Sequence, residues 1–396
     1  MFEGVRIIEL AQWVFVPACG MVFAEYGADV IKIENPATGD PYRGLSTQGI
    51  GAAVGNVNLN WEQNNRGKRS IGLDIRTEKG RELMYKLVAG ADVFLTNFRP
   101  EALERLGYGV EALRAHNPSL IFARGSGYGV RGPEADTAAY DSTAYWSRGG
   151  LSHTLTPVDY DGEVASRGAI GDKPAGMNLA FGVAAALFKK AKTGQGSIVD
   201  TSLLGSAVWT ISSDIMSAAL RSEPADPSVK PNRRLGGWRT KDDRLLVVQF
   251  LNDGHWAPLM KVIGREDLTV DPRFAKRVDR IANNAAYEAE VEATILTKTL
   301  AEWNEILRPS LGPWAPVQSV DEVVRDPQVI ANNYLHTLTS PEGDKYSLAS
   351  APVEFDETPA DPGFAPNVGE HTDEILEQLG LSWDDIIQLK LDNVVA

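Results

Sequence analysis

The chain has 396 residues, more than one compact core usually holds, so we expect two domains. Hydrophobic residues make up 43% and charged residues 23%, as in ordinary soluble globular proteins. The formal net charge of -14 argues against nucleic acid and against an anionic membrane as the main partner, but it leaves room for a local basic pocket that binds an anionic ligand.

The cysteine count and the N-terminal residues bear on the compartment. The single cysteine, Cys19, excludes an intrachain disulfide and a cysteine-rich zinc site, fits a reducing cytosol, and stands in an apolar segment typical of a buried helix. Residues 1–6 lack the basic and apolar regions of a signal peptide, and the longest apolar run, 179–188, is about half a membrane span. We therefore expect a cytoplasmic protein with no membrane partner. The five histidines show no metal-ligand spacing, so no metal site is expected.

The N-terminal third alternates strands and helices, which predicts a parallel sheet. Strands are predicted over 5–10, 28–34, 70–75, 91–96 and 120–123, and helices over 17–26, 77–88 and 101–106. The turn after the first strand lacks Gly-x-Gly-x-x-Gly, which disfavours a dinucleotide cofactor. A glycine-rich loop is predicted over 124–129, where the backbone can approach a ligand.

A long connection over 35–69 carries the densest basic cluster of the chain, Arg66-Gly67-Lys68-Arg69. A connection of this length inside an enzyme domain is usually functional or interfacial. The cluster is either a solvated loop or a contact for phosphate groups, and the sequence leaves both interpretations open.

The second half divides at a proline-spaced segment. Helices are predicted over 174–191 and 202–220 with a strand over 197–200 between them, followed by a linker over 221–232. A hairpin over 238–250 and helices to about residue 307 predict a smaller α+β domain over 233–320. Short helices and proline-rich connections follow over 321–396.

The stretch 132–150 places one carboxylate, Asp141, between a Gly-Pro break and a Gly-Gly break. Asp141 is either a helix cap or a nucleophile that attacks an activated acyl group. The neighbouring Tyr145 and Trp146 either shape an apolar acyl pocket or pack in the core. Neither a phosphate-binding Walker loop nor a Gly-x-Ser-x-Gly elbow occurs in the chain.

Several segments, in this order and spacing, resemble the class III CoA-transferases, the carnitine-dehydratase/bile-acid-inducible family, over nearly the whole length. They are residues 26–36 with Gly39-Asp40, 65–75, Asn97-Phe98-Arg99-Pro100, 126–129 with Gly132-Pro133, Tyr140-Asp141, Gly171-Asp172, 193–196 and 369–372.

The resemblance implies an α/β fold with a Rossmann-like large domain whose parallel sheet is built from both chain ends (1–220 and 321–396). It also implies an interlocked homodimer. It makes Asp141 the nucleophile that forms a mixed anhydride and then an aspartyl-CoA thioester, splitting one hard exchange into easier steps. Coenzyme A and acyl-CoA are then substrates, an acid is the acceptor, and no tightly bound cofactor is expected.

The same resemblance implies a set of CoA-binding residues. Val14 and Phe15 would lie along the pantetheine, Leu73 and Arg76 near the adenine and its phosphates, and Arg105 on a phosphate. The groove and the thioester would be bordered by Asn35, Asn97, Phe98, Arg99, Ser126, Gly127, Tyr128 and Tyr140. Val14, Asn35 and Ser126 replace Gln, Arg and Lys of some members, and no glycine-rich lid stands near residues 235–237. Small, oxalate-like substrates are therefore in doubt. The stretch 139–150 is more similar to transferases that use hydroxy or aromatic acids, such as phenyllactate, or to the carnitine type.

Two other functions remain open at this point. The same family includes α-methylacyl-CoA racemases, which use a histidine and an aspartate in facing positions. No histidine stands between His116 and His153, so the histidine of that pair is missing before Asp141. The third hypothesis is a non-catalytic acyl-CoA binder.

Overall fold

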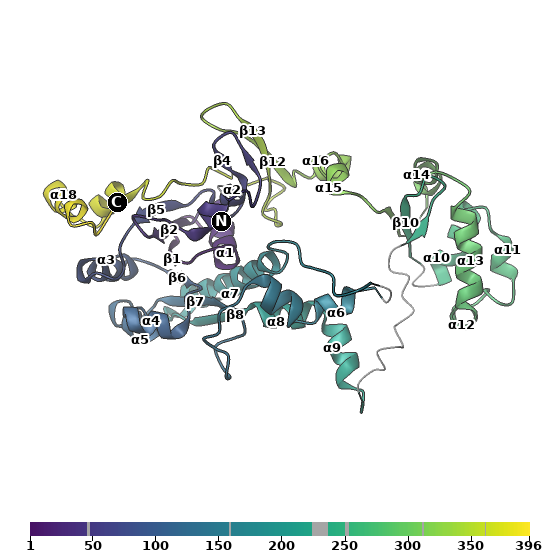
Figure 1. Ribbon diagram of the computed structural model, residues 1–396, viewed down its shortest axis with the longest axis horizontal. Coiled ribbons are helices and arrows are strands. Elements are labelled where there is room, and N and C mark those ends of the chain that lie inside the picture. The colour runs from purple at the N-terminus through teal and green to yellow at the C-terminus, as the bar shows by residue number, and fades with distance from the viewer. Residues whose placement is uncertain (46–47, 158–159, 224–236, 250–252, 311–312, 361) are drawn as a thin grey trace. The chain divides into compact units, whose positions relative to one another are not determined.

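The computed structural model describes residues 1–396 except 46–47, 158–159, 224–236, 250–252, 311–312 and 361 (Figure 1). The chain forms two compact units, Met1–Ala225 with Asn332–Ala396, and Asp226–Ala331. Most of the predicted linker 221–232, and residues 235 and 236 of the segment compared with a lid, lie outside the described residues.

The large unit is built on a six-stranded parallel sheet in the order β5-β2-β1-β6-β7-β8. The strands are β1 (Arg6–Leu10), β2 (Asp29–Glu34), β5 (Arg69–Gly72), β6 (Val93–Thr96), β7 (Ile121–Ser126) and β8 (Ile198–Ser202). The sheet order reverses between β1 and β6, because the chain runs outward to β5 before it returns. Ligands of open parallel sheets bind at such a point, outside the carboxyl ends of the strands.

Two expectations about this sheet are corrected. Its strands all come from residues 6–202, so the sheet is not built from both chain ends. The described residues of the C-terminal segment add no strand to it, and Val395 forms an isolated bridge with Leu73. Arg124, Gly125 and Ser126 belong to β7 and not to a loop, because they pair with Asp200, Thr201 and Ser202 of β8.

Helices cover both faces of the sheet. One core contains residues of α1 (Phe15–Glu25), α7 (Asp172–Thr193) and α8 (Leu203–Thr210), and α1 and α7 lie against each other (Figure 1). The other core contains residues of α3 (Glu78–Ala89), α4 (Pro100–Leu106), α5 (Val110–His116), α17 (Thr372–Gln378) and α18 (Trp383–Leu391). Cys19 is buried in α1, as expected. The remaining elements of this half are α6 (Leu151–Leu155) and α9 (Ser212–Ala219).

The connection over 35–69 is more ordered than expected. It contains η1 (Pro41–Leu45), β3 (Ala53–Val54), β4 (Val57–Asn58) and α2 (Leu59–Asn65). Arg66 and Lys68 are buried: Arg66 Nε donates to Glu25 Oε2 at 3.0 Å, and Lys68 Nζ to Glu9 Oε2 at 2.8 Å. These two cations are therefore structural, and neither interpretation of the basic cluster holds for them.

The small unit has its own core. The predicted hairpin is present as β9 (Trp238–Arg239) and β10 (Leu245–Val248), and β10 also pairs with β11 (Trp314–Pro316). Its helices are α10 (Asp253–Val262), α11 (Asp267–Val270), α12 (Arg277–Ala282), α13 (Asn284–Ile295), α14 (Leu300–Leu307), α15 (Val320–Val323) and α16 (Pro327–Ala331). A second hairpin, β12 (Leu335–Thr339) with β13 (Lys345–Ala349), belongs to the large unit and was not predicted.

Candidate active site

The loop after β1 lies at the point where the sheet order reverses, and buried or half-buried side chains hold its backbone at Ala11, Gln12 and Trp13. Asn97, at the end of β6, accepts from the Gln12 N–H at 3.0 Å and donates to the Gln12 carbonyl at 2.6 Å. Lys32 donates to the Ala11 carbonyl at 2.8 Å, and Asp40 Oδ1 accepts from the Trp13 N–H at 3.2 Å. Trp13 has φ +66°, a left-handed conformation that is uncommon for a residue with a side chain.

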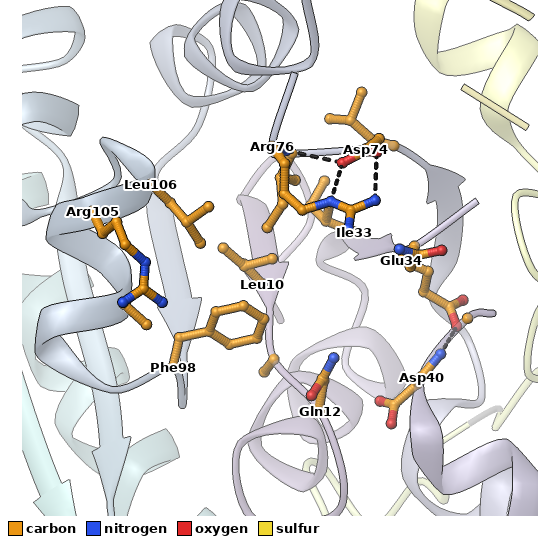
Figure 2. Close-up of a pocket in the computed structure, with 16 residues that line it drawn as sticks. Leu10, Gln12, Ile33, Glu34, Asp40, Asp74, Arg76, Phe98, Arg105 and Leu106 are labelled. Atoms are coloured by element: carbon orange, nitrogen blue, oxygen red, sulfur yellow. Dashed lines mark hydrogen bonds and ion pairs between the residues drawn. The ribbon is translucent and has the colours of Figure 1, made fainter. Parts of the chain in front are cut away.

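A first cavity of about 330 Å³ lies outside the ends of β1, β2 and β5, beside α4. Figure 2 shows Leu10 and Phe98 near its centre, with Arg105 on one side and Glu34 and Asp40 on the other. Five residues expected to bind CoA line this cavity: Asn35, Leu73, Arg76, Phe98 and Arg105. Arg76 is exposed and pairs with Asp74 at 2.7 Å.

A second cavity of about 390 Å³ shares Gln12, Phe98 and Ala102 with the first, so the two adjoin. Six residues expected at the groove line it: Asn97, Phe98, Arg99, Ser126, Gly127 and Tyr140. We call the two cavities together the groove. Its size is in the range of sites for small molecules and cofactors.

Four expected residues do not line either cavity. Val14 is buried in a cluster with Tyr42 and Trp61, and Phe15 is buried in the core over α1 and α7. Tyr128 is half-buried, with the Arg148 guanidinium 4.9 Å from its ring centroid. Asp141 is 8% exposed, but its neighbours Tyr140 and Thr143 reach the second cavity.

Asp141 begins the π-helical turn η2 (Asp141–Ser147), and Tyr140 occupies the N-cap position, so Asp141 is not the cap. Its Oδ2 accepts a hydrogen bond from the Gly171 N–H at 3.3 Å. Tyr145 and Trp146 pack in the core. The Tyr145 hydroxyl shares a hydrogen bond with Thr210 Oγ1, and Trp146 Nε1 donates to the Val164 carbonyl. The core interpretation of these two aromatic residues is therefore the one that holds.

The residue after Gly171 brings a second carboxylate to Asp141. Asp172 is the first residue of α7, and burial together with the charge of Asp141 raises its pKa from 3.8 to about 7. No residue that the structure describes donates a hydrogen bond to the Asp172 side chain, whereas neighbouring Lys173 donates to Asn64 Oδ1. Burial, more than any nearby charge, lowers the pKa of Lys173 to about 8.

The sequence named Gly171-Asp172 only as part of a resemblance, with no chemical role for the carboxyl. Asp172 stands 31 positions after Asp141, at the start of a helix, and nothing in the sequence indicates that the two carboxyls lie close together. Trp13 was missed as well, because its left-handed backbone depends on Asp40.

The raised pKa of Asp172 predicts how stability changes with pH. The folded state holds the proton of the Asp172 carboxyl more tightly than the unfolded chain does. Binding of this proton therefore stabilises the fold fully below pH 3.8, and this contribution is lost as pH rises towards about 7. Asp172→Asn should therefore raise the free energy of unfolding, relative to the unmodified protein, more at about pH 8 than at about pH 4.5. Urea unfolding at the two pH values measures this, and an equal difference at both would contradict it.

In the part of the chain that the structure describes, no three His, Cys, Asp or Glu side chains group as metal ligands would, and no helix is long and apolar enough to cross a membrane.

Comparison with known proteins sets this site in a family. A family profile described as CoA-transferase family III matches residues 2–372. The chain is 35% identical to a cinnamoyl-CoA:phenyllactate CoA-transferase of Clostridium sporogenes, over 99% of this chain and 96% of the relative. It is 33% identical to an (R)-2-hydroxy-4-methylpentanoate CoA-transferase of Clostridioides difficile, over 100% and 99%.

Solved structures agree. Rv3272 of Mycobacterium tuberculosis, crystallised also as an aspartate-to-alanine mutant, has a TM-score of 0.80 with 29% identity, over 94% of this chain and 98% of that one. A CAIB/BAIF family protein of Brucella suis has a TM-score of 0.77 with 29% identity, over 95% and 98%. The chain belongs to the family III CoA-transferases.

Proposed function

We propose that the protein moves CoA from an acyl-CoA to a carboxylic acid, with its nucleophile in the Asp141–Asp172 pair. The observation that carries this is a pair of interacting carboxyls, one of which, Asp141, directly follows Tyr140 in the wall of the second cavity. Covalent capture by a carboxylate needs such a group beside a binding groove for the thioester. The named activities of the relatives support the same reaction class.

Of the two carboxyls, Asp172 is the better nucleophile on physical grounds, and Asp141, the residue expected from the sequence, is the second candidate. The side chain of Asp172 is half-buried and so more accessible to a substrate than that of Asp141, which is 8% exposed. None of the described residues donates a hydrogen bond to the Asp172 carboxyl oxygens, whereas Asp141 accepts one from the Gly171 N–H. A desolvated carboxylate with a raised pKa is also more nucleophilic than a solvated one.

The reaction then proceeds by acyl exchange at this carboxylate. An oxygen of the aspartate attacks the thioester carbonyl and the C–S bond breaks. CoA leaves as a thiolate, and the aspartate and the donor acyl group are then joined as a mixed anhydride. The thiolate attacks the aspartyl carbonyl and displaces the donor acid, which leaves an aspartyl-CoA thioester. The acceptor carboxylate attacks that thioester, which forms a second mixed anhydride and releases the thiolate. The thiolate then attacks the acceptor acyl carbonyl and displaces the aspartate, whose carboxylate is regenerated. Each step exchanges one acyl bond for another, so no external base is consumed.

The groove offers a place for CoA beside this centre. The first cavity joins an apolar wall of Leu10, Leu73 and Phe98 to the exposed guanidinium groups of Arg76 and Arg105. An adenine and its phosphates need these two kinds of surface. The second cavity leads to Tyr140, next to Asp141, where the pantetheine arm would end.

Trapping the enzyme intermediate tests the proposal. Incubation with an acyl-CoA and hydroxylamine should convert one aspartate to its hydroxamate, which mass spectrometry of peptides locates. A hydroxamate at Asp172 supports the preferred assignment, one at Asp141 supports the second candidate, and modification of neither with CoA transfer intact would contradict both.

The racemase and binder alternatives predict different results. The racemase stays an alternative function because of one observation: Asp172 has a raised pKa and lies near Asp141. Two such carboxyls could serve as acid and base at an acyl α-carbon. Deuterium wash-in at that carbon without CoA exchange would favour it. Binding of CoA in a calorimeter, with no turnover on any acid, would favour a non-catalytic binder.

We also propose that the enzyme is a cytosolic homodimer, with the family resemblance implying interlocked chains. Large apolar side chains are exposed on the adjacent helices α7, α8 and α9 and at the C-cap of α9: Phe181, Phe188, Trp209, Met216 and Leu220 are each more than half exposed. A patch of this kind usually marks a protein interface. Light scattering should give the mass of two chains, and Trp209→Asp should shift it towards one; a monomeric unmodified protein would contradict this.

A further inference from the structure

Trp13 lies in the wall of the second cavity, and contacts on several sides fix its position. Its indole lines the second cavity and meets the Tyr140 ring edge to face, with centroids 5.5 Å apart at 85°. It also contacts Tyr42, at 6.3 Å and 66°. Tyr140 precedes Asp141 in the chain. Burial, and after it the negative charge of Asp172, raises the pKa of Tyr42 to about 12. Trp13 thus stands between two aromatic residues that adjoin the carboxyl pair.

Buried polar side chains hold Trp13 in this place. Asp40 Oδ1 accepts from the Trp13 N–H at 3.2 Å and from the Tyr42 N–H at 2.9 Å, so one carboxylate fixes both aromatic residues. Asp40 is 2% exposed and pairs through Oδ2 with the buried Lys32 at 3.0 Å. A left-handed backbone at a tryptophan persists only where its surroundings enforce it, and such residues cluster at functional sites.

Small apolar side chains form part of the wall of the second cavity, which also contains the uncharged polar side chains of Gln12, Asn97, Ser126, Thr137 and Thr143. Val130, Ala135, Ala138 and Ala139 line it, and Tyr140 is 56% exposed, which leaves ring surface for a ligand. Of the two arginines in the lining, Arg124 already pairs with Asp200, and Arg99 is exposed and donates to the Asp136 carbonyl. The cavity therefore suits an apolar acyl group better than a second carboxylate.

We propose that Trp13 and Tyr140 form the specificity-determining wall for the acyl group, and that it selects aromatic or branched aliphatic acids over acetate-sized acids and dicarboxylates. Asp40 is a positioning residue that acts through Trp13. This inference rests on the proposed CoA transfer, because it names the acids that the same centre handles.

The experiment measures the first half-reaction with four thioesters: 3-phenylpropanoyl-CoA, 4-methylpentanoyl-CoA, acetyl-CoA and succinyl-CoA. The observable is the rate of aspartyl hydroxamate formation in hydroxylamine as each thioester concentration is varied. The unmodified enzyme should favour the first two thioesters by about tenfold or more. Trp13→Ala should remove most of that preference by weakening binding of the apolar thioesters, with about threefold or less change for acetyl-CoA.

Conservative variants separate specificity from a structural role. Trp13→Phe should retain most of the preference, since a ring remains opposite Tyr140. Asp40→Asn keeps the Oδ1 acceptor and should retain the preference, whereas Asp40→Ala should lower it like Trp13→Ala. Trp383→Ala, on α18 and half exposed, is the matched control and should leave all four rates unchanged.

The outcomes that overturn the inference are distinct from failure of the proposed function. If no thioester modifies the enzyme and none supports transfer, the CoA-transfer proposal itself fails. If all four react at similar rates, or if succinyl-CoA is preferred, transfer stands and the specificity wall is wrong. Equal losses with all four thioesters in Trp13→Ala would assign Trp13 a structural role only and also overturn it.

Discussion

Asp172→Asn is expected to lower the rate of CoA transfer by about a thousandfold or more, with little change in CoA binding. A carboxamide cannot attack the thioester to form an anhydride, and the groove residues that would hold CoA are untouched. Asp172→Ala serves as the second variant, because slow hydrolysis of an asparagine can regenerate the carboxylate. Steady-state transfer assays and calorimetric CoA titrations measure the two quantities.

Asp141 variants make the comparison informative. If Asp172 is the nucleophile, Asp141→Asn should leave the hydroxamate at Asp172 and should lower the Asp172 pKa, because the nearby negative charge that helps to raise it is gone. The pH profile of trapping should then shift to lower pH. Asp384→Asn, an exposed acid on α18, is the matched control. Full transfer activity in Asp172→Ala would refute the assignment, and loss of trapping only in Asp141→Asn would give the role to Asp141.

Arg66→Met is expected to destabilise the large unit by about 3–5 kcal/mol, because removing one partner leaves a buried charge unpaired. The guanidinium is fully buried and donates to Glu25 Oε2, to the Gln63 carbonyl at 2.9 Å and to the Ala349 carbonyl at 2.9 Å. It therefore joins α1, α2 and β13, which are far apart in the sequence. Chemical denaturation followed by fluorescence measures the loss.

A surface ion pair supplies the control for Arg66. Lys79 pairs with Asp392 at 2.5 Å, but its side chain is 53% exposed, so Lys79→Met should cost about 1 kcal/mol or less. Adding Glu25→Gln to Arg66→Met should recover part of the lost stability, since the unpaired carboxylate is then neutral. Equal effects of Arg66→Met and Lys79→Met would show that the buried pair is not important for stability.

The sequence predicted the elements of the sheet well, because strands buried on both faces are continuous apolar runs bounded by helix caps and glycines. Thr77 caps α3 and Gly90 ends it, as the local signals predicted. Less was predicted of the connection over 35–69 and of β12 and β13, whose residues are ordered by contacts with distant segments. Gln63, for example, bonds to the Ala349 backbone, 286 positions away.

The same division holds for the site. Sequence alone determined the family, the alternation of strands and helices, and the segments that gather at the groove, because each is encoded in local patterns and motif order. Only the tertiary structure decided that Asp172 meets Asp141, that Arg66 and Lys68 are buried partners of Glu25 and Glu9, and that Asp40 fixes Trp13. The physical reason is that burial and distance set the pKa of a carboxyl and the role of a cation, and neither quantity exists until residues far apart in the chain are packed together.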